Sequence, residues 1–183
     1  MLQPLKTRAT YEDLCAVDEL LIAELIDGDL YASARPPVPY VHTASVLAAR
    51  IGAAFDGVEG PGGWLQLNKP EIHLRDDAIV PDIAAWRCER LPQKIPDYFD
   101  FAPDWLCEVL APNTEALDRT KKLPVYAREG VGHVWLVNPA IQTLEVLRLE
   151  SQRWSLVAAY EGKRCVRAEP FADFELELAW LWA

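Results

Sequence analysis

The stretch Phe101-Ala-Pro-Asp-Trp-Leu-Cys-Glu-Val-Leu-Ala-Pro-Asn-Thr114 decides the fold. Its centre, Trp105 to Leu110, is a short apolar run between two prolines, which is typical of a buried strand in an α/β sheet. Glu108 lies in the middle of this run. A carboxylate there is costly to remove from water unless a metal ion, a cation or hydrogen-bond donors meet it.

A second acid lies in a similar setting earlier in the chain. The short apolar run Ala78-Ile-Val-Pro-Asp-Ile-Ala-Ala-Trp86 contains Asp82. Two lone acids on two interior strands indicate a shared site. The alternative interpretations are a turn acid at a strand end for Asp82 and a buried ion pair for Glu108.

Length and composition predict one globular domain over residues 1–183. A chain of 183 residues is long enough for one full core and short for two domains. Hydrophobic residues make up 51% and charged residues 25%, which argues against disorder. No apolar run approaches the roughly 20 residues needed to span a bilayer. The first residues also lack the apolar core of a signal peptide. We therefore expect a cytoplasmic protein without a membrane partner.

Charge, cysteine and histidine usage narrow the chemistry. The formal net charge of −10 argues against non-specific binding to phosphate backbones, although an acidic metal site contributes to that total. The spacing of the cysteines and histidines predicts neither a disulfide framework nor a zinc site. These residues are Cys15, Cys88, Cys107, Cys165, His42, His73 and His133.

The remaining patterns predict a mixed sheet flanked by helices, in the α/β or α+β class. Asp27-Gly28 is a hairpin signal inside residues 23–31. Residues 57–63 predict a glycine-rich turn without a phosphate-binding loop. Further strands are expected over residues 64–67, 71–74, 79–86, 105–110, 134–137, 143–149 and 154–158.

Three helices are expected. Thr10 and Asp13 form a capping-box pattern before apolar residues that extend to Ile22. A second helix covers residues 40–55, where apolar residues keep helical spacing. The third begins between Glu115 and Lys121 and ends at Glu129; Pro124 favours a late start near Thr120.

The third helix is expected to bring a lysine to the acids. Asp118 and Lys122 share a helix face at i and i+4, and Tyr126 continues it. Two carboxylates plus a lysine suit phosphodiester hydrolysis, because carboxylates hold Mg²⁺ and lysine stabilises developing charge. From the residues alone, however, Asp118 is better explained as an acid favoured by the helix dipole, and Lys122 as a solvated lysine.

Several pieces of the chain together resemble the Uma-two family of the PD-(D/E)XK restriction-endonuclease-like superfamily. They occur in the family's order over residues 10–150. The pieces are Glu24-Leu-Ile-Asp-Gly-Asp-Leu30, Val80-Pro-Asp82, Pro103 to Thr114, Asp118 to Leu123, Tyr126, and Gly130 to Pro139.

The resemblance implies a restriction-endonuclease-like core and a set of site residues. Asp82 and Glu108 match the metal-binding acids, and Glu24 adds a further acid, the alternative being an edge-strand surface residue. Leu110 stands where the superfamily has its lysine, and Lys122 matches the lysine supplied by the next helix. The chain departs from the family at Ala111, Gly132-His133, Asn138 and Pro124, none of which is a metal ligand.

The leading hypothesis is a nuclease that uses Mg²⁺ or Mn²⁺, acts on DNA rather than RNA, and forms a homodimer. The runner-up is a non-catalytic binding or regulatory module that keeps the nuclease fold. The charge of −10 and Leu110 favour the runner-up. A third hypothesis is a metal-free hydrolase that uses Asp82 and Glu108 as acid and base on a small substrate.

Overall fold

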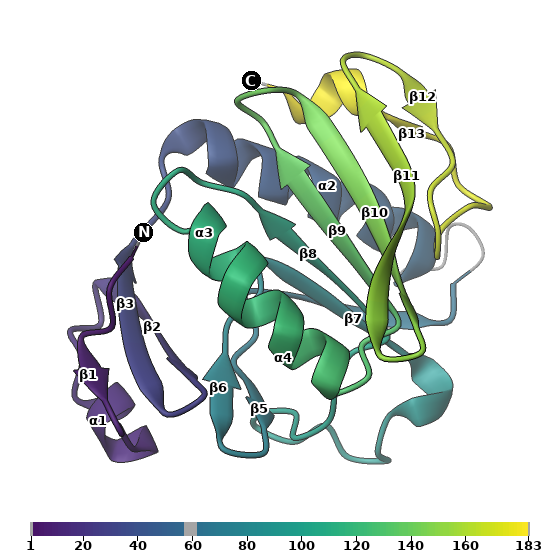
Figure 1. Ribbon diagram of the computed structural model, residues 1–183. Helices are drawn as coiled ribbons and strands as arrows, with labels where there is room; N and C mark the ends of the chain where they lie inside the picture. Colours follow the sequence, from purple (N-terminus) through teal and green to yellow (C-terminus); the bar gives the residue numbers. More distant parts are fainter. Residues whose placement is uncertain (1, 57–61, 183) are drawn as a thin grey trace.

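The computed structural model describes residues 2–56 and 62–182. Most of the glycine-rich turn expected over residues 57–63 therefore lies outside the described residues. In the described part of the chain two larger sheets form the body (Figure 1). One has the strand order β1 (Lys6–Thr7), β3 (Asp29–Ala34), β2 (Leu21–Ile26), β6 (Asp77–Ile79), β5 (Ile72–Leu74). The other has the order β11 (Arg153–Glu161), β10 (Thr143–Glu150), β9 (His133–Asn138), β8 (Trp105–Val109), β7 (Ile83–Arg87), β4 (Trp64–Asn68).

The sheet that contains β8 is mixed and is covered by helices on both faces. β8 runs parallel to β9 and antiparallel to β7. Alternate residues of β8 point to opposite faces. Trp105 and Cys107 pack in the core beneath helix α2 (Val38–Phe55), whereas Leu106 packs in the core beneath helix α4 (Leu123–Arg128). The predicted mixed sheet flanked by helices is confirmed. As expected, β7, which follows Asp82, lies beside β8, which contains Glu108.

The prediction of one strand over residues 79–86 is wrong, because these residues belong to two sheets. β6 ends at Ile79 and pairs with β2, whereas β7 begins at Ile83 and pairs with β8. Pro81 lies between them and has no N–H to give to a strand ladder. Asp82 therefore lies at the junction between the sheets.

The N-terminal helix is shorter than predicted. The capping box is present, since Thr10 accepts from the Asp13 N–H and Asp13 accepts from the Thr10 N–H, but α1 covers only Tyr11–Cys15. Asp18 then forms a turn, because its side chain and carbonyl accept the N–H groups of Leu20 and Leu21. Leu21 begins β2. The predicted hairpin is confirmed, with φ of +50° at Asp27 and +78° at Gly28.

The helix that carries Lys122 begins at Glu115, the early limit of the predicted range, and not near Thr120, where Pro124 favoured its start. α3 (Glu115–Leu117) continues through a π-helical segment, η2 (Asp118–Lys122), into α4. In η2 the Leu123 N–H donates to the Asp118 carbonyl, one residue farther back than in an α-helix. Pro124 accounts for this wide turn, because a proline ring collides with the carbonyl four residues before it in an α-helix. The chain widens its turn at Pro124 instead of starting the helix late.

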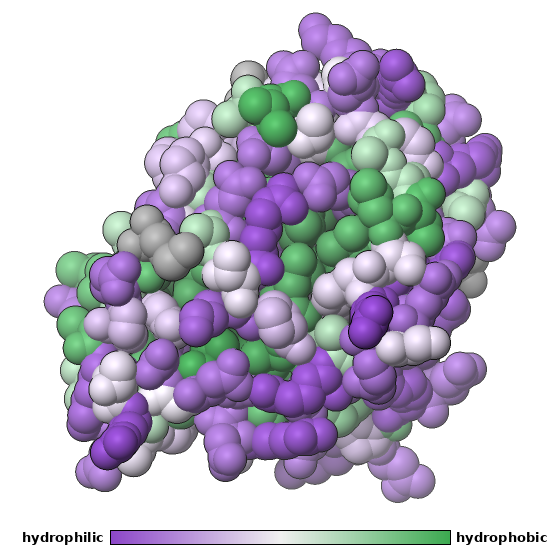
Figure 2. Space-filling model, viewed as in Figure 1, coloured by the Kyte–Doolittle hydropathy of each residue, from purple (hydrophilic) through white to green (hydrophobic). Residues whose placement is uncertain are grey.

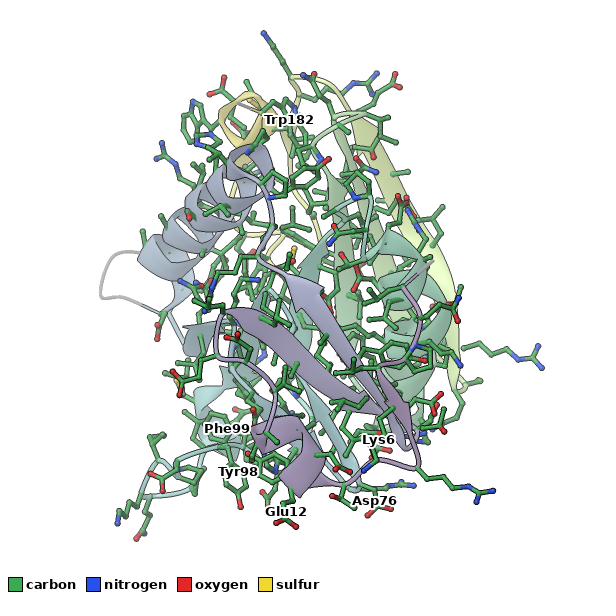
Figure 3. The ribbon with its side chains drawn as sticks, turned by 90° about the vertical axis from the view of Figure 1, so that its left-hand side faces the viewer. Lys6, Glu12, Asp76, Tyr98, Phe99 and Trp182 are labelled. Carbon is green, nitrogen blue, oxygen red and sulfur yellow. The ribbon has the colours of Figure 1, made fainter. Side chains whose placement is uncertain are left out.

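Smaller elements complete the molecule. They are η1 (Cys88–Arg90), β12 (Cys165–Val166), β13 (Leu176–Glu177) and η3 (Leu178–Leu181). In Figure 3 the β1–β3 part of the first sheet lies in front of the molecule, with Glu12 of α1 at its lower end. Hydrophilic residues cover most of the face in Figure 2. Over the described ranges, the chain has no helix of the length and apolar character needed to cross a membrane.

Candidate active site

Glu108 is a buried carboxylate on the side of β8 that faces α4. The residue is 2% exposed. Its Oε1 accepts a hydrogen bond of 2.5 Å from the Tyr126 hydroxyl and lies 2.9 Å from Lys122 Nζ. Burial raises the pKa of Glu108 to about 8; Lys122 lowers it, and the neighbouring carboxylates of Asp118, Asp82 and Glu24 raise it further. Within the described part of the chain, no hydrogen bond reaches its second oxygen, Oε2.

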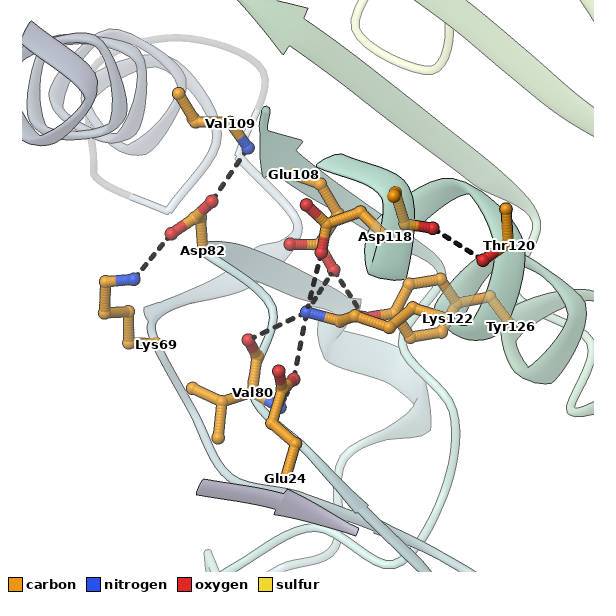
Figure 4. A network of polar contacts seen from close by, with 11 residues as sticks. Glu24, Lys69, Val80, Asp82, Glu108, Val109, Asp118, Thr120, Lys122 and Tyr126 are labelled. Carbon is orange, nitrogen blue, oxygen red and sulfur yellow. Dashed lines mark hydrogen bonds and ion pairs between the residues drawn. The ribbon is translucent and has the colours of Figure 1, made fainter. Parts of the chain in front are cut away.

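Lys122 lies between three carboxylates (Figure 4). Its side chain is 3% exposed, and it also donates to the Val80 carbonyl at 3.2 Å. Burial lowers the pKa of Lys122, but the surrounding carboxylates outweigh this and hold the pKa well above its usual value. The distances from Nζ are 3.0 Å to Glu24, 2.9 Å to Glu108 and 3.5 Å to Asp118.

Glu24 and Asp118 reach this lysine from different elements. Glu24 on β2 also accepts the Val80 N–H at 2.9 Å, so it ties the hairpin to the junction beside Asp82. Asp118, which the sequence favoured as a helix-dipole acid, is instead 4% exposed inside the cluster. Burial raises its pKa to about 6, and Lys122 opposes the shift. Asp118 faces inward in the wide turn η2, four residues before Lys122.

Asp82 occupies the outer side of the site. Its Oδ2 accepts the Val109 N–H at 2.8 Å, and its Oδ1 lies 2.6 Å from Lys69 Nζ. Lys69 was not among the predicted site residues. The signal that could have found it is strand pairing, because Asn68 lies opposite Ile83 in the β4–β7 ladder. Lys69, the residue that follows β4, then lies opposite Asp82, and its N–H donates to the Asp82 carbonyl.

All four acids and both lysines line one pocket. The cavity has a volume of about 260 Å³ and also borders the start of α2 through Tyr40 and Val41. We call it the acidic pocket. Its charged lining residues, among those that the structure describes, are Glu24, Asp82, Glu108, Asp118, Lys69 and Lys122.

The donor set of the acidic pocket suits a divalent cation. With every group ionised, four carboxylates and two ammonium groups leave two negative charges in excess. Oxygen donors are those that Mg²⁺ prefers, and a cation relieves the repulsion between neighbouring carboxylates. Over residues 2–56 and 62–182, no three His, Cys, Asp or Glu side chains are already arranged around a common metal position. Lys122 takes the central position among Glu24, Glu108 and Asp118.

A family model described as "Putative restriction endonuclease" matches residues 8–180. The chain belongs to the Uma2 family. The resemblance inferred from the sequence is therefore confirmed, and Uma2 membership supports a nuclease function. No curated protein matches the chain.

A solved structure with a similar fold supports the architecture. It is the crystal structure of a putative nuclease belonging to DUF820 from Anabaena variabilis ATCC 29413. The TM-score is 0.77 at 22% sequence identity, and the match covers 94% of this chain and 99% of that chain. At this identity the likeness concerns the fold alone. The mixed α/β architecture of this Uma2 chain is thus shared with a solved protein.

Proposed function

We propose that this Uma2 chain is a metal-dependent nuclease that hydrolyses phosphodiester bonds, with Asp82 and Glu108 holding Mg²⁺ or Mn²⁺. The observation that carries the proposal is the excess of buried carboxylates over cations in the acidic pocket. Buried charges without full compensation are destabilising. Their presence on a fold of this family therefore favours a functional role. A bound ion would activate water and neutralise negative charge on the phosphate.

The protein groups around the two acids orient them. Tyr126 and Lys122 hold Oε1 of Glu108, which leaves Oε2 available as an oxygen ligand. The Val109 N–H holds one oxygen of Asp82. Because the pKa of Glu108 is raised to about 8, a cation has to compete with a proton for this carboxylate. Metal binding is therefore expected to strengthen as the pH rises towards 8.

Lys122 assists the site in this proposal as a cation buried among the acids. Its ammonium supplies positive charge to Glu24, Glu108 and Asp118. Glu24 in turn links Lys122 to the backbone of Val80. The expectation that Lys122 itself stabilises charge on the phosphate stays a prediction.

The test is metal-dependent cleavage by matched variants. Plasmid DNA, single-stranded DNA and RNA would be incubated with the wild type, Asp82→Asn, Glu108→Gln and the control Asp76→Asn in Mg²⁺ and Mn²⁺. Asp76 is exposed in the turn between β5 and β6. We expect both site variants to lose at least about 10²-fold in rate, the scale of losing one transition-state contact, and Asp76→Asn to keep full activity.

Calorimetry with the same ions separates the alternatives. Metal binding without cleavage in the wild type would favour the non-catalytic module. Cleavage that persists in both site variants would contradict the proposed roles of Asp82 and Glu108. Activity on a small substrate without metal would favour the acid–base hydrolase.

DNA as the substrate, a homodimer and a cytoplasmic location complete the proposal. The three substrates above distinguish DNA from RNA. Light scattering at two protein concentrations measures the oligomeric state, for which we expect twice the chain mass of 20.6 kDa. A monomer at both concentrations would contradict the dimer and leave the chemistry of the acidic pocket unaffected.

A further inference from the structure

We propose that Lys69 is the residue that contacts the substrate phosphate in the acidic pocket. This inference rests on the proposed nuclease function and concerns a residue outside the pieces of sequence that carry the family resemblance. Lys69 Nζ lies 2.6 Å from Asp82 Oδ1, and its side chain is 36% exposed. It lines the same pocket as Glu108 and Lys122.

The two lysines of the pocket differ in their capacity to bind another anion. An ammonium group has three N–H donors. Four oxygens already surround Lys122 Nζ within 3.5 Å, and the side chain is 3% exposed. Lys122 would have to leave buried carboxylates to reach a phosphate. Among the described residues, Asp82 is the one acceptor within hydrogen-bond distance of the Lys69 ammonium. Donors therefore remain on Lys69.

The backbone directs Lys69 towards the site. Its φ is +48°, a left-handed conformation that is uncommon for residues other than glycine. The Lys69 N–H donates to the Asp82 carbonyl at 3.0 Å, which holds this conformation at the end of β4. In Figure 4, Lys69 and Lys122 approach the acids from opposite sides. Lys69 is thus fixed at its backbone, and its partly exposed ammonium group is held by one carboxylate.

The chemistry suits a phosphate oxygen. A phosphodiester carries one negative charge, as the Asp82 carboxylate does. Its oxygen can therefore bind the Lys69 ammonium beside Asp82 or in place of Asp82. A flexible lysine stem allows this exchange without a change of the backbone. The competing interpretation is an exposed ion pair without a function, which typically contributes little to stability.

The first experiment measures binding rather than cleavage. A fluorescent DNA duplex and a fluorescent single strand would be titrated with the full chain in EDTA and in Ca²⁺, at 50 to 200 mM salt. The proteins are the wild type, Lys69→Asn, Lys69→Arg and Lys163→Asn. Asn tolerates the left-handed conformation of residue 69, so the variant removes the cation without adding strain. Lys163 is an exposed lysine between β11 and β12.

Loss of one phosphate contact has a defined signature. We expect Lys69→Asn to bind about 3- to 10-fold more weakly and to lower the slope of log K against log salt by about one. Lys69→Arg should keep the slope, and Lys163→Asn should match the wild type. Equal affinity and slope in all four proteins would overturn the proposal. Undetectable binding by the wild type in both buffers would also overturn it.

The second experiment separates this inference from the proposed function. With Mn²⁺, Lys69→Asn should lose about 10²–10³ in cleavage rate, the size expected for one electrostatic contact to the transition state. If the wild type cleaves and Lys69→Asn is fully active, the role of Lys69 is overturned, and the proposed nuclease function is not. A wild type that binds with the Lys69-dependent slope but does not cleave supports the phosphate contact and contradicts the nuclease function.

Discussion

The helical segment from α3 to α4 carries two cations, Lys122 and Arg128, and each is surrounded by its own cluster of acids. The two clusters are built differently. Arg128 on α4 gives a separate nitrogen to each of three carboxylates: Nη1 to Asp27 at 2.7 Å, Nε to Glu129 at 2.7 Å, and Nη2 to Asp77. Lys122 on η2 offers one ammonium group to three carboxylates. The Arg128 side chain is 38% exposed, whereas that of Lys122 is 3% exposed.

This difference separates a structural link from the proposed metal site. The planar fork of Arg128 connects the hairpin and β6 to α4, and water screens its outer side. Burial raises the pKa of Asp77, while the Asp27 N–H and Arg128 oppose the shift. In the Lys122 cluster burial prevails, and the pKa of Glu108 reaches about 8. The acids of the Lys122 cluster therefore keep their protons to a higher pH than free carboxylic acids do.

Removing the cation of the Lys122 cluster should have the largest effect. Lys122→Ala leaves three buried carboxylates without a cation. Loss of one partner from a buried ion pair costs about 3–5 kcal/mol of unfolding free energy. Urea unfolding at pH 8 measures this loss. If Lys122 also stabilises charge on the phosphate, the cleavage rate falls by about 10²–10³ with metal binding largely intact.

Lys121→Ala is the matched control for this variant. Lys121 is exposed, about one hundred degrees around the helix in α-helical geometry. Its replacement should change the unfolding free energy by less than about 0.5 kcal/mol. Equal losses in the two variants would contradict the central position of Lys122.

The pH dependence of stability should be the second largest effect. Folding raises the pKa of Glu108 from 4.5 to about 8 and that of Asp118 from 3.8 to about 6. The folded state then holds protons that the unfolded state has released, so the metal-free protein loses stability as the pH rises from about 4.5 to 8. One group contributes at most about 1.4 kcal/mol per pH unit. Glu108→Gln should flatten this dependence in urea unfolding.

A replacement in the Arg128 cluster provides the comparison for the pH series. Glu129→Gln removes a carboxylate that contacts Arg128 and should leave the slope unchanged. A metal-free wild type whose stability rises from pH 5 to 8 would contradict the burial of ionised acids in the acidic pocket.

Metal binding should relieve the repulsion between the carboxylates of the acidic pocket. Mg²⁺ or Mn²⁺ at about one hundred times its Kd stabilises a folded protein by about 2.7 kcal/mol, so the melting temperature should rise by several degrees. Asp82→Asn with Glu108→Gln should abolish the rise, and this double variant should melt above the wild type in EDTA. Asp27→Asn in the Arg128 cluster should keep the rise. An unchanged wild-type melting curve at millimolar metal would argue against a metal site.

Local patterns were enough to predict two of the four acids of the acidic pocket, Asp82 and Glu108, because each lies in a short apolar run. Asp82 and Glu108 could therefore be found without any contact map, and Glu24 came from its place in the family motif. Lys69 could not, since its position depends on the register between β4 and β7. Asp118 was interpreted as an acid favoured by the helix dipole, although its i, i+4 spacing already predicted the face that it shares with Lys122. Strands next to the acids were predicted as neighbours, and they are.

Proline explains two of the errors. Pro81 ends the pairing of β6 and separates two strands that were predicted as one. Pro124 was taken as a reason for a late helix start, whereas the helix begins at Glu115 and widens at η2. At Pro81 the missing N–H interrupts the pairing between strands, and at Pro124 the ring changes the hydrogen bonding of the preceding helical turn. The local sequence specifies neither outcome. The helix predicted to reach Ile22 failed because Asp18 forms a turn.

The smallest effect is expected for a change of geometry at constant charge in the Arg128 cluster. Arg128→Lys keeps the positive charge but replaces three separate donors in a planar fork with a point charge. The loss of one or two well-placed hydrogen bonds at a half-exposed site should cost about 1 kcal/mol, or roughly 2–4 °C in melting temperature. Cleavage and metal binding should stay within about two-fold of the wild type, because Arg128 does not line the acidic pocket. Melting curves and the plasmid assay would test both statements. A loss of cleavage in Arg128→Lys, at unchanged stability, would mean that the two clusters are coupled through α4 and that the Arg128 cluster is more than a structural link.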